Sequence, residues 1–409
     1  MNPAQHSSAS RFPPPASVAI IGGGPAGVSA ALELTRRGVA TIVLERSGGA
    51  GNPVGECLAP TINPLLHRLR LECALTASGA LPSHGNRSAW GGDGAPMERD
   101  FLREPFGHGW HLDRPAFNAA LLQTAEAAGV LVWRHARVLS LARDAGDWEI
   151  DIELPDGVRT ISAAWLIDAS GRAAVVARNL GVRRRRFDTQ VAVVASLEQS
   201  AGVAPLQDAT THIEAEESGW WYAALLPDQR LTVTCFTDPD LLATSGVWRP
   251  DAWWGQLAAS HLVWEAVSRH QYAVPERIQT VPAGSLLLPN PAGEWWVAAG
   301  DAAATFDPLS SHGIGSALAG GEHAAAALAS AIAGDVAALP AYAARVRTGY
   351  ARYLWLRHAY YADERRWPDA PFWVRRHSET REPTALESVS NQTGRRARCS
   401  AAGPDDAWL

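Results

Sequence analysis

The sequence predicts an α/β protein with a three-layer core, an inserted mixed β-sheet domain and a C-terminal helical segment. Three observations support this prediction. A strand, a glycine-rich turn and a helix follow one another near the start of the chain, two later apolar strands end in turns of small residues, and other regions alternate apolar and polar residues as half-buried strands do. With 409 residues, the chain is long enough for two closely joined domains.

The first segment runs from Val18 to Glu45. An apolar strand leads into Gly22, Gly24 and Gly27, and a helical stretch and a second apolar strand follow. This order is typical of a Rossmann-type unit, in which the first two glycines let the backbone approach a pyrophosphate and the third lets helix pack on strand. An acidic residue at position 45 favours ribose hydroxyls over a 2′-phosphate. The candidate nucleotide-binding residues here are Gly22, Gly24, Pro25, Ala26, Gly27, Glu45 and Arg46.

Two further strands end in turns of small residues. The strand that ends at Asp168 continues into Ala-Ser-Gly, and the strand from residue 296 continues into Gly300 and Asp301. A carboxylate at the second strand end can hold a ribityl hydroxyl, and a nicotinamide enzyme has no ribityl chain. The stretch 307–315 then begins a helix, whose N–H groups and dipole suit the negative charge of a reduced isoalloxazine. The three segments together predict a Rossmann-type FAD-binding domain.

On these motifs the chain resembles the flavoprotein monooxygenases with the aromatic-hydroxylase type of fold, a group that also contains the flavin-dependent halogenases. The resemblance covers about residues 18–361. It implies that Asp168 and Gly171 lie near the pyrophosphate, that Asp301 binds the ribitol, and that residues 308–315 face the flavin ring. The other cofactor-binding residues that we assign are Arg114, Gly300, Pro308, Gly313 and Ile314.

Changes of pattern along the chain predict its organisation. We assign the FAD-binding domain to residues 15–80, 113–183 and 289–335, a substrate-facing loop to 81–112, a substrate-binding β-sheet domain to 184–288, C-terminal helices to 336–377 and a flexible tail to 378–409. Segments 149–154, 191–197, 219–226 and 231–236 alternate like strands, and Pro227-Asp228 joins the last two as a hairpin turn. Asp113 is the predicted cap of a helix over 115–128.

Composition argues against several partners. The formal net charge is −6, so nothing indicates nucleic acid, and no apolar run is long enough to insert in a membrane. The four cysteines are scattered, and His108 and His111 lack a third ligand in sequence, so we predict neither a disulfide framework nor a metal site. The leader before residue 18 has no apolar core, which predicts a cytoplasmic protein.

The residues between flavin and substrate follow the second strand and the third FAD segment. The resemblance implies that the loop at 54–60 passes near the isoalloxazine, so Glu56 is a candidate catalytic base or a backbone-capping carboxylate. Cys57 could touch the flavin, tune its potential or attach to it, or be a small buried residue. His312 could position substrate or oxygen, or be a neutral hydrogen-bonded histidine. The candidate substrate residues are Trp90, Trp110, Trp221 and Tyr222.

Five segments, 55–60, 88–91, 107–114, 219–222 and 307–311, are similar to flavoproteins that mature peptidyl quinone cofactors. This closer resemblance implies hydroxylation of a tryptophan side chain in a partner polypeptide, on the way to tryptophylquinone. In such a monooxygenase, reduced flavin and molecular oxygen give a C4a-hydroperoxide, which an electron-rich ring attacks. The chain has one dinucleotide fingerprint, so reducing equivalents would come from transiently bound NAD(P)H or from a separate flavin reductase.

Other functions remain open at this stage. Tryptophan halogenases use a lysine between flavin and substrate, whereas all 36 basic residues here are arginine. Their W-x-W-x-I-P motif, aligned on Pro227, has Tyr222 and Ala224 at the tryptophan positions. The same fold also serves small-molecule aromatic hydroxylases and flavin reductases. A flavin-binding escort, which shields a partner protein without changing its mass, is the non-enzymatic alternative.

Overall fold

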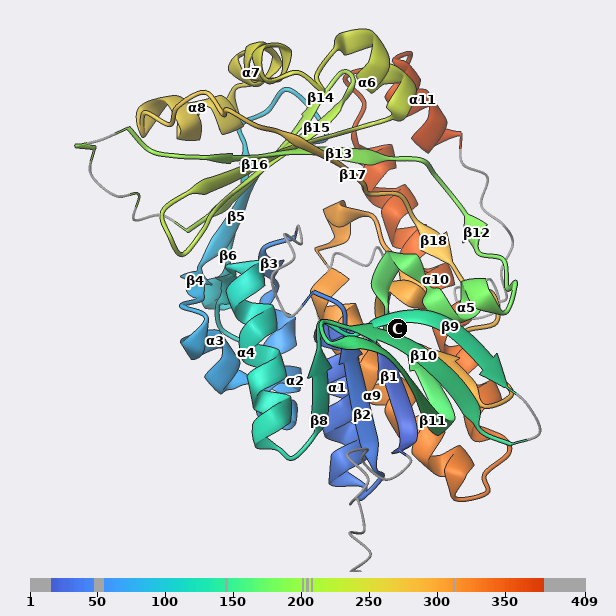
Figure 1. Ribbon diagram of the computed structural model, residues 1–409. Helices are drawn as coiled ribbons and strands as arrows, with labels where there is room; N and C mark the ends of the chain where they lie inside the picture. The colour runs from blue at the N-terminus through green and yellow to red at the C-terminus, as the bar shows by residue number, and fades with distance from the viewer. Residues whose placement is uncertain are drawn as a thin grey trace, which may run out of the picture.

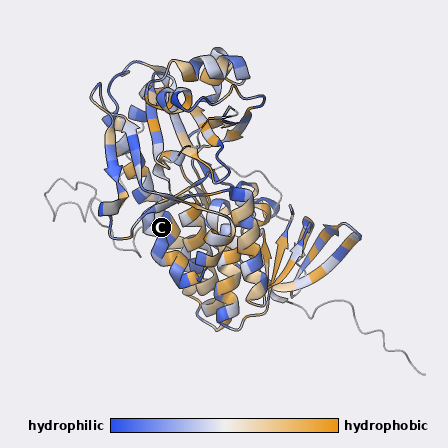
Figure 2. Ribbon diagram, turned by 90° about the vertical axis from the view of Figure 1, so that its left-hand side faces the viewer, coloured by the Kyte–Doolittle hydropathy of each residue, from blue (hydrophilic) through white to orange (hydrophobic). Residues whose placement is uncertain are grey.

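The computed structural model describes residues 16–47, 55–143, 146–200, 202–203, 206, 209–311 and 313–378. In Figure 1 a sheet flanked by helices forms the lower half of the molecule, and a second sheet lies across the top. Hydrophilic and hydrophobic residues both occur along the helices and the outer strands of the lower half (Figure 2), as expected for elements with one face toward solvent. Of the predicted tail, only residue 378 is among the described residues.

Eight strands of the described chain form the lower sheet, with a parallel core in the order β20, β11, β1, β2, β8. In this register Ile21 lies opposite both Leu44 and Asp168, and Asp168 lies opposite Ala298. The carboxyl ends of the four central strands therefore meet at one edge, where open α/β sheets bind ligands. The bounds are β1 Ala16–Ile21, β2 Thr41–Glu45, β8 Leu131–Arg134, β9 Arg137–Arg143, β10 Trp148–Leu154, β11 Gly157–Asp168, β19 Ala292–Gly293 and β20 Trp296–Ala298.

Two layers cover this sheet, so the predicted three-layer fold is confirmed. Val18 and Ile20 face the helices, whereas Ala19 and Ile21 face the antiparallel β9–β10–β11 extension. The strand alternation of β1 thus fills both cores. The helices of the lower half are α1 Pro25–Arg36, α2 Asn63–Leu69, α3 Glu72–Ala77, α4 Arg114–Ala127, α5 Val175–Asn179 and α9 Gly313–Ile332.

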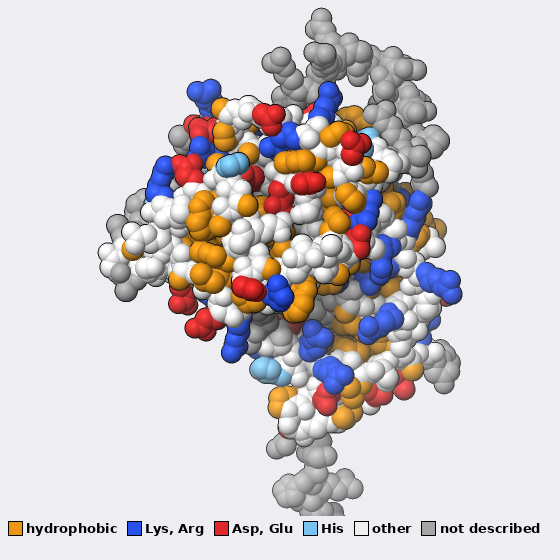
Figure 3. Space-filling model, turned by 90° about the horizontal axis from the view of Figure 1, so that it is seen from above, with side chains coloured by type: hydrophobic (Ala, Val, Ile, Leu, Met, Phe, Trp, Pro, Cys, Tyr) orange, Lys and Arg blue, Asp and Glu red, His pale blue; other side chains and the backbone are white. Residues whose placement is uncertain are grey.

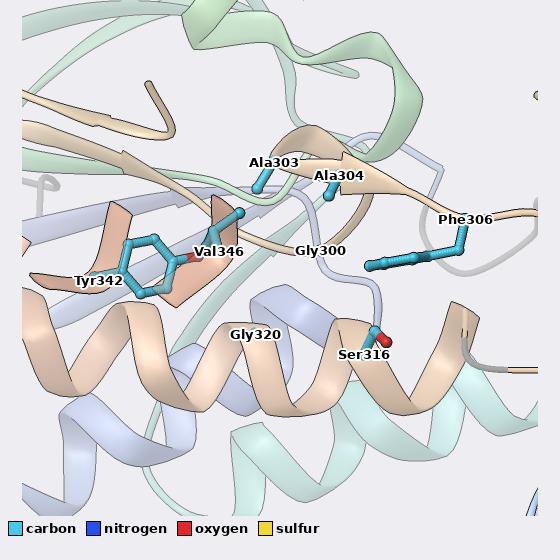
Figure 4. Close-up of a pocket in the computed structure, with 8 residues that line it drawn as sticks. All are labelled: Gly300, Ala303, Ala304, Phe306, Ser316, Gly320, Tyr342 and Val346. Carbon is cyan, nitrogen blue, oxygen red and sulfur yellow. The ribbon is translucent and has the colours of Figure 1, made fainter. Parts of the chain in front are cut away.

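Helices α1 and α9 cross at very close range because glycine occupies the crossing point. A Cβ on Gly321 would lie 2.1 Å from the carbonyl oxygen of Ala26, and a Cβ on Gly300 would lie 2.8 Å from the Ala26 Cβ. A cavity of about 10 Å³ beside this contact is lined by Gly300, Gly320 and Tyr342 among others (Figure 4). That volume is close to the space of a single water, so the packing around the crossing is nearly complete.

Seven strands of the described chain form the upper sheet, in the order β17, β13, β16, β15, β14, β5, β6. The β14–β5 pair is parallel and the other pairs are antiparallel, which confirms the predicted mixed sheet. The 219–226 and 231–236 strands form the expected hairpin. The bounds are β5 Gly85–Ala89, β6 Met97–Asp100, β13 Val191–Leu197, β14 Thr211–Glu216, β15 Gly219–Leu225, β16 Leu231–Thr237 and β17 Gln279–Pro282.

The outer face of the upper sheet is covered by helices that the strand pattern did not predict. Trp253 and Val263 of these helices pack against Trp221 and Val233 of the sheet. Seen from above, this side mixes hydrophobic, acidic and basic side chains (Figure 3). Two strands of the sheet, β5 and β6, come from the segment expected to be a substrate-facing loop. The covering helices are α6 Pro239–Ser245, α7 Pro250–Ala258 and α8 Leu262–Arg269.

The C-terminal helices join the two halves. Helix α10 (Ala338–Asp363) buries Tyr350 in the lower half and Tyr361 under the upper sheet, and α11 (Pro371–His377) adds Phe372 and Trp373 there. The tyrosines along α10 therefore form a packing surface. Among the described residues, no helix combines the length and apolarity needed to span a membrane.

A buried ionic cluster stands where these helices meet both halves. Arg357 of α10 lies 3.1 Å from Asp307 and 3.2 Å from Asp188 between donor and carboxylate atoms. The Tyr361 hydroxyl donates to the same Asp307 carboxylate at 2.9 Å and approaches the amide oxygen of Gln190 at 3.3 Å. All the Asp307 and Arg357 side-chain atoms are nearly inaccessible, which makes these bonds strong constraints on geometry.

The remaining elements are short and position loops. Asp113 caps α4 as predicted, by accepting from the Ala116 N–H at 2.9 Å. The bounds are β3 Cys57–Leu58, β4 Leu81–Ser83, β7 Gly109–His111, β12 Arg185–Arg186, β18 Leu286–Leu287, β21 Ala304–Thr305, η1 Pro60–Ile62, η2 Phe101–Arg103, η3 Gly171–Ala173, η4 Gly300–Ala302 and η5 Pro308–Ser310.

A pair of glycine substitutions tests the helix crossing. Gly321→Ala should destabilise the fold by about 2 kcal/mol or more, because the added Cβ would overlap backbone of α1. Gly255→Ala in α7 should stabilise it by about 0.5–1 kcal/mol, because no atom lies within 4 Å of the added Cβ. Chemical denaturation followed by circular dichroism should therefore shift in opposite directions, and a shift in the same direction would contradict the packing argument.

Candidate active site

The glycine turn between β1 and α1 has the shape that a pyrophosphate requires. Gly22 has φ +107°, and a Cβ there would lie 2.3 Å from the Ala169 carbonyl oxygen. A Cβ on Gly27 would lie 1.9 Å from the Gly22 oxygen, so only glycine allows α1 to approach β1. Gly24, by contrast, has no atom within 4 Å of its Cβ position. Pro25 follows as the first helical residue, so the N-terminus of α1 opens toward this free space.

Glu45 ends β2 beside this turn. Its carboxylate accepts from the Gly23 N–H at 2.7 Å and from the N–H and hydroxyl of Ser47 at 2.7 and 2.6 Å. These bonds fix an acidic group next to the α1 N-terminus, where the ribose of a bound dinucleotide would lie. Arg46 is exposed at the same edge. The sequence-based placement of the adenosine end thus fits the geometry of the turn.

Asp168 at the end of β11 is completely buried and holds a loop. Its carboxylate accepts from the N–H and hydroxyl of Ser170 and from the N–H groups of Val176 and Ala177 at 2.5–3.2 Å. Burial raises the pKa of Asp168, and these hydrogen bonds oppose the rise. Gly171 follows with φ +68°. Asp168 therefore fixes the shape of the loop beside the glycine turn by hydrogen bonds to residues of that loop and of α5.

Asp301 lies in η4 directly after Gly300, at the end of β20. Its carboxylate is 3.9 Å from the Arg172 guanidinium, and part of its side chain remains accessible. Desolvation raises the pKa of Asp301, and the positive charges of Arg172, Arg114 and Arg184 oppose the rise. An accessible carboxylate among arginines suits a ribityl hydroxyl near a pyrophosphate. Sequence reasoning missed Arg172 and Arg184, because no motif connects them to Asp301.

The N-terminus of α9 is the remaining part of the candidate cofactor cradle, which also includes the glycine turn, Glu45 and Asp301. Pro308 lies in η5, which Asp307 caps by accepting from the Leu309 N–H at 3.0 Å. Gly313 and Ile314 begin the 20-residue helix, and its first turn contains no acidic residue. The free N–H groups there suit a negatively charged ring. His312 lies outside the described residues, so its catalytic role stays a prediction.

Arg114 lies between two carboxylates. It is buried at the start of α4 and donates to the Gly55 carbonyl oxygen at 2.6 Å, while Glu56 and Asp301 both raise its pKa against the effect of burial. Glu56 is also buried; burial raises its pKa and Arg114 lowers it. Arg114 therefore connects the loop that carries Glu56 to the predicted ribitol carboxylate.

Cys57 on β3 contacts the upper sheet. Its Sγ lies 2.8 Å from the Tyr222 hydroxyl and 3.4 Å from Oγ1 of Thr211. Burial raises the pKa of the Cys57 thiol to about 12. A neutral thiol is a poor nucleophile, so this environment disfavours flavin attachment through Cys57. Sequence reasoning did not identify Thr211, and it considered His111, which bonds to Thr211, only as a metal ligand.

The four predicted substrate residues separate in space. Tyr222 lies on the inner face of the upper sheet and is partly accessible. Trp90 packs edge-on against Trp220, Tyr361 and Trp373, and its N–H donates to the Tyr360 carbonyl oxygen. It therefore closes the junction with the C-terminal helices.

Trp110 and Trp221 also make structural contacts. Trp110 donates to the Asn63 side chain at 2.8 Å. The sequence-based assignment of Trp221 to the substrate site does not fit the structure. Trp221 is fully buried, packs on Trp253 of α7 and donates to Glu216. Strand alternation places it on the outer face, opposite to Tyr222, so it cannot contact a substrate held between the two halves.

Comparison with known proteins agrees with this geometry. The chain belongs to the FAD binding domain family, whose model matches residues 15–355. It is 30% identical to LodB of Marinomonas mediterranea, named as an FAD-dependent oxidoreductase, over 88% of this chain and 96% of that protein. It is 28% identical to tryptophan 2-halogenase of Chondromyces crocatus over 80% of this chain and 63% of that protein.

Solved structures share the fold. The peptidyl tryptophan dihydroxylase QhpG, described as essential for tryptophylquinone cofactor biogenesis, has a TM-score of 0.75 and 26% identity, covering 91% of this chain and 81% of that chain. The myxobacterial chondrochloren halogenase CndH has a TM-score of 0.79 at 22% identity, covering 93% and 89%. The protein is therefore an FAD-dependent oxidoreductase of the aromatic hydroxylase and halogenase superfamily.

The Glu45 carboxylate can be tested through cofactor affinity. Glu45→Gln should raise the dissociation constant for FAD about tenfold, because one charge-assisted bond to the ribose is weakened. Glu126→Gln, on the exposed face of α4, is the matched control and should leave the affinity unchanged. Titration of the apoprotein with FAD by fluorescence quenching measures both. Equal affinities for all three proteins would remove Glu45 from the cofactor site.

The protonation of Cys57 can be tested by alkylation. At pH 8 a thiol whose pKa is about 12 is almost entirely neutral, so Cys57 should react with iodoacetamide much more slowly than the exposed Cys73, by more than about tenfold. Peptide mass spectrometry of the native protein at successive times gives both rates. Equal labelling would contradict the buried, protonated state of Cys57.

Proposed function

We propose that this protein is an FAD-dependent monooxygenase that hydroxylates a tryptophan side chain of a partner polypeptide. The observation that carries the proposal is the neutral inner face of the upper sheet opposite β3. Val194, Ile213 and Tyr222 lie in one cross-strand row through Thr234, and the three are partly accessible. A flat surface of apolar and aromatic groups suits a neutral planar ring.

The similarity to QhpG supports a peptidyl tryptophan as the ring. That enzyme's name states a peptidyl tryptophan dihydroxylase, and the likeness extends over most of both chains. The composition supports hydroxylation over lysine-dependent halogenation, because the chain contains no lysine.

Different residues of the protein would bind the cofactor, exclude water and accept a proton. Bound FAD supplies the two-electron activation of molecular oxygen, of which one atom enters the ring and the other leaves as water, with electrons from NAD(P)H or a separate flavin reductase. Gly22, Gly24, Glu45 and Asp301 hold and orient the cofactor, and the upper sheet excludes water from the reacting face. Glu56, which directly precedes Cys57 at the contact with Tyr222, would accept the proton that the ring carbon loses; burial raises its pKa, which makes its carboxylate a stronger base.

Halogenation is the second candidate. The specific observation in its favour is that several halogenases match this chain over similar lengths, including CndH and tryptophan 2-halogenase. The two functions need the same fold and the same cofactor, and they differ in the atom added to the ring.

Mass spectrometry of a tryptophan-containing peptide separates the candidates. The holoprotein is supplied with NADH, a flavin reductase, ¹⁸O-labelled oxygen and bromide, beside a control peptide with phenylalanine in place of tryptophan. Hydroxylation should add one or two ¹⁸O atoms to the tryptophan peptide alone. Free tryptophan, tested in parallel, should react more slowly than the peptide.

Each other outcome has a distinct meaning. A bromine isotope doublet on the indole would replace the proposal with a halogenase. Labelled oxygen in free tryptophan but not in the peptide would indicate a small-molecule hydroxylase. An unchanged peptide mass, tested with the natural partner polypeptide as well, would overturn the proposal in favour of a reductase or an escort.

A further inference from the structure

A chain of hydrogen bonds connects the inner face of the upper sheet to a buried histidine. It begins at the hydroxyl of Tyr222, a residue that is partly accessible, passes to Cys57 Sγ at 2.8 Å and then to Thr211 Oγ1 at 3.4 Å. It continues to Nε2 of His111 at 2.9 Å and ends where Nδ1 of His111 meets the Leu225 carbonyl oxygen at 2.9 Å. Three segments far apart in sequence supply these groups. Nothing in the cofactor cradle requires this arrangement.

His111 fixes the direction in which each hydrogen bond of this series points from donor to acceptor. A carbonyl oxygen only accepts, so Nδ1 of His111 carries a hydrogen and donates to Leu225. In the neutral ring Nε2 is then an acceptor, and the Thr211 hydroxyl donates to it. The Thr211 oxygen can accept from the Cys57 S–H, and the sulfur can accept from the Tyr222 O–H. The Tyr222, Cys57 and Thr211 donors all point toward His111, whose own Nδ1–H points on to the Leu225 carbonyl oxygen.

The protonation of the first two groups, Tyr222 and Cys57, agrees with this direction. Burial raises the pKa of Tyr222 well above its ordinary value, and the neighbouring Cys57 and Glu56 raise it further. Burial also raises the pKa of Cys57 to about 12. Both groups are therefore protonated near neutral pH and available as donors. His111 has no accessible surface, and Thr211 is the group through which its Nε2 connects to Cys57 and Tyr222.

Because the Tyr222 hydroxyl donates its hydrogen to Cys57, it can interact with a substrate only as a hydrogen-bond acceptor. Its hydrogen points to Cys57, so the phenolic oxygen keeps lone pairs that can accept a hydrogen bond from a substrate. An indole ring has a single polar group, the N–H, which can only donate. Donor and acceptor therefore match. The match also orients the ring, because the N–H fixes one edge of the indole against β15.

We propose that the Tyr222 oxygen accepts the N–H of the substrate indole and that the chain through Cys57 and Thr211 to His111 stores this proton during hydroxylation. The inference rests on the proposed function and adds the basis of its specificity for indole. When oxygen bonds to a ring carbon, the ring nitrogen becomes cationic and its proton acidic. Removing the proton from the cationic ring nitrogen lowers the energy of the oxygenated ring intermediate. Stabilising the transition state that leads to this intermediate accelerates the reaction.

The proton transfers balance. The nitrogen gives its proton to Tyr222, which gives its own to the Cys57 sulfur; Cys57 gives its proton to Thr211, and Thr211 gives its proton to Nε2 of His111. No electrons move in this step. When the oxygenated carbon loses its hydrogen to a base, the chain runs in reverse and the ring nitrogen regains a proton. The four groups therefore end as they began.

The test uses two peptides that differ in the ring N–H. One carries tryptophan and the other carries benzothienylalanine, in which sulfur replaces the N–H at nearly the same shape. Both are given to the holoprotein and to its variants, and kcat and KM for oxygen insertion are measured. Tyr272→Phe is the matched control, because that hydroxyl bonds to Gln229 in the outer-face cluster, away from the chain.

The expected results separate orientation from proton storage. Tyr222→Phe should reduce kcat/KM for the tryptophan peptide about tenfold and leave the benzothienyl peptide nearly unchanged, since one hydrogen bond is lost. Thr211→Val should lower kcat for the tryptophan peptide about tenfold with little change in KM, because the ring still binds Tyr222 while the chain is broken. Thr211→Ser retains a hydroxyl and should restore kcat.

Three outcomes would overturn the inference. An unchanged preference for tryptophan in Tyr222→Phe would exclude the oxygen as the acceptor. Equal losses on both peptides in Thr211→Val, or no rescue by Thr211→Ser, would reduce the chain to a structural contact. A wild-type protein that oxidises neither peptide would overturn the proposed function, and this inference with it.

Discussion

The buried contact of Arg357 with Asp307 and Asp188 holds the molecule in its functional form. Asp307 caps η5 in the loop that leads to α9, Asp188 lies in the loop that leads to β13 of the upper sheet, and Arg357 comes from α10. Charges so deeply buried are stable only as a complete set, since removal of one partner typically costs about 3–5 kcal/mol. The cluster therefore ties α10 to the loop before α9 and to the loop before β13, and so links the two halves of the molecule.

Within that frame, two different kinds of chemistry face each other. The lower half offers glycines, helix N-termini, Asp301 and arginines, which together suit the charges of a dinucleotide. The upper half offers neutral side chains, with Tyr222 as the polar group that reaches Cys57. A polar cradle opposite an apolar face lets a charged cofactor and a neutral ring meet without exposing either to bulk water. The lower-half groups lie at strand ends and helix N-termini, whereas strand alternation determines the inner face of the upper sheet.

Much of the lower half could be predicted from the sequence, because its motifs are local. The glycine turn, Glu45 and the strand ends lie within short segments, in which the residue types themselves indicate the backbone conformation. The upper half was harder. Adjacent Trp221 and Tyr222 must face opposite sides of a strand, but which side is inner depends on α7 and α8, which come later in the chain. His111 and Thr211 are 100 residues apart, so no spacing rule connects them.

The residues themselves therefore established the cofactor class, the strand–turn–helix unit at the start of the lower half, the absence of lysine and the presence of a mixed sheet. They could do so because steric limits on glycine turns and the two-residue period of strands act over a few residues. The substrate-facing surface, the burial of Cys57 and the direction of its hydrogen bonds came from the packing of the two halves. Burial and hydrogen-bond partners depend on atoms contributed by distant segments, and only the folded chain brings those atoms together.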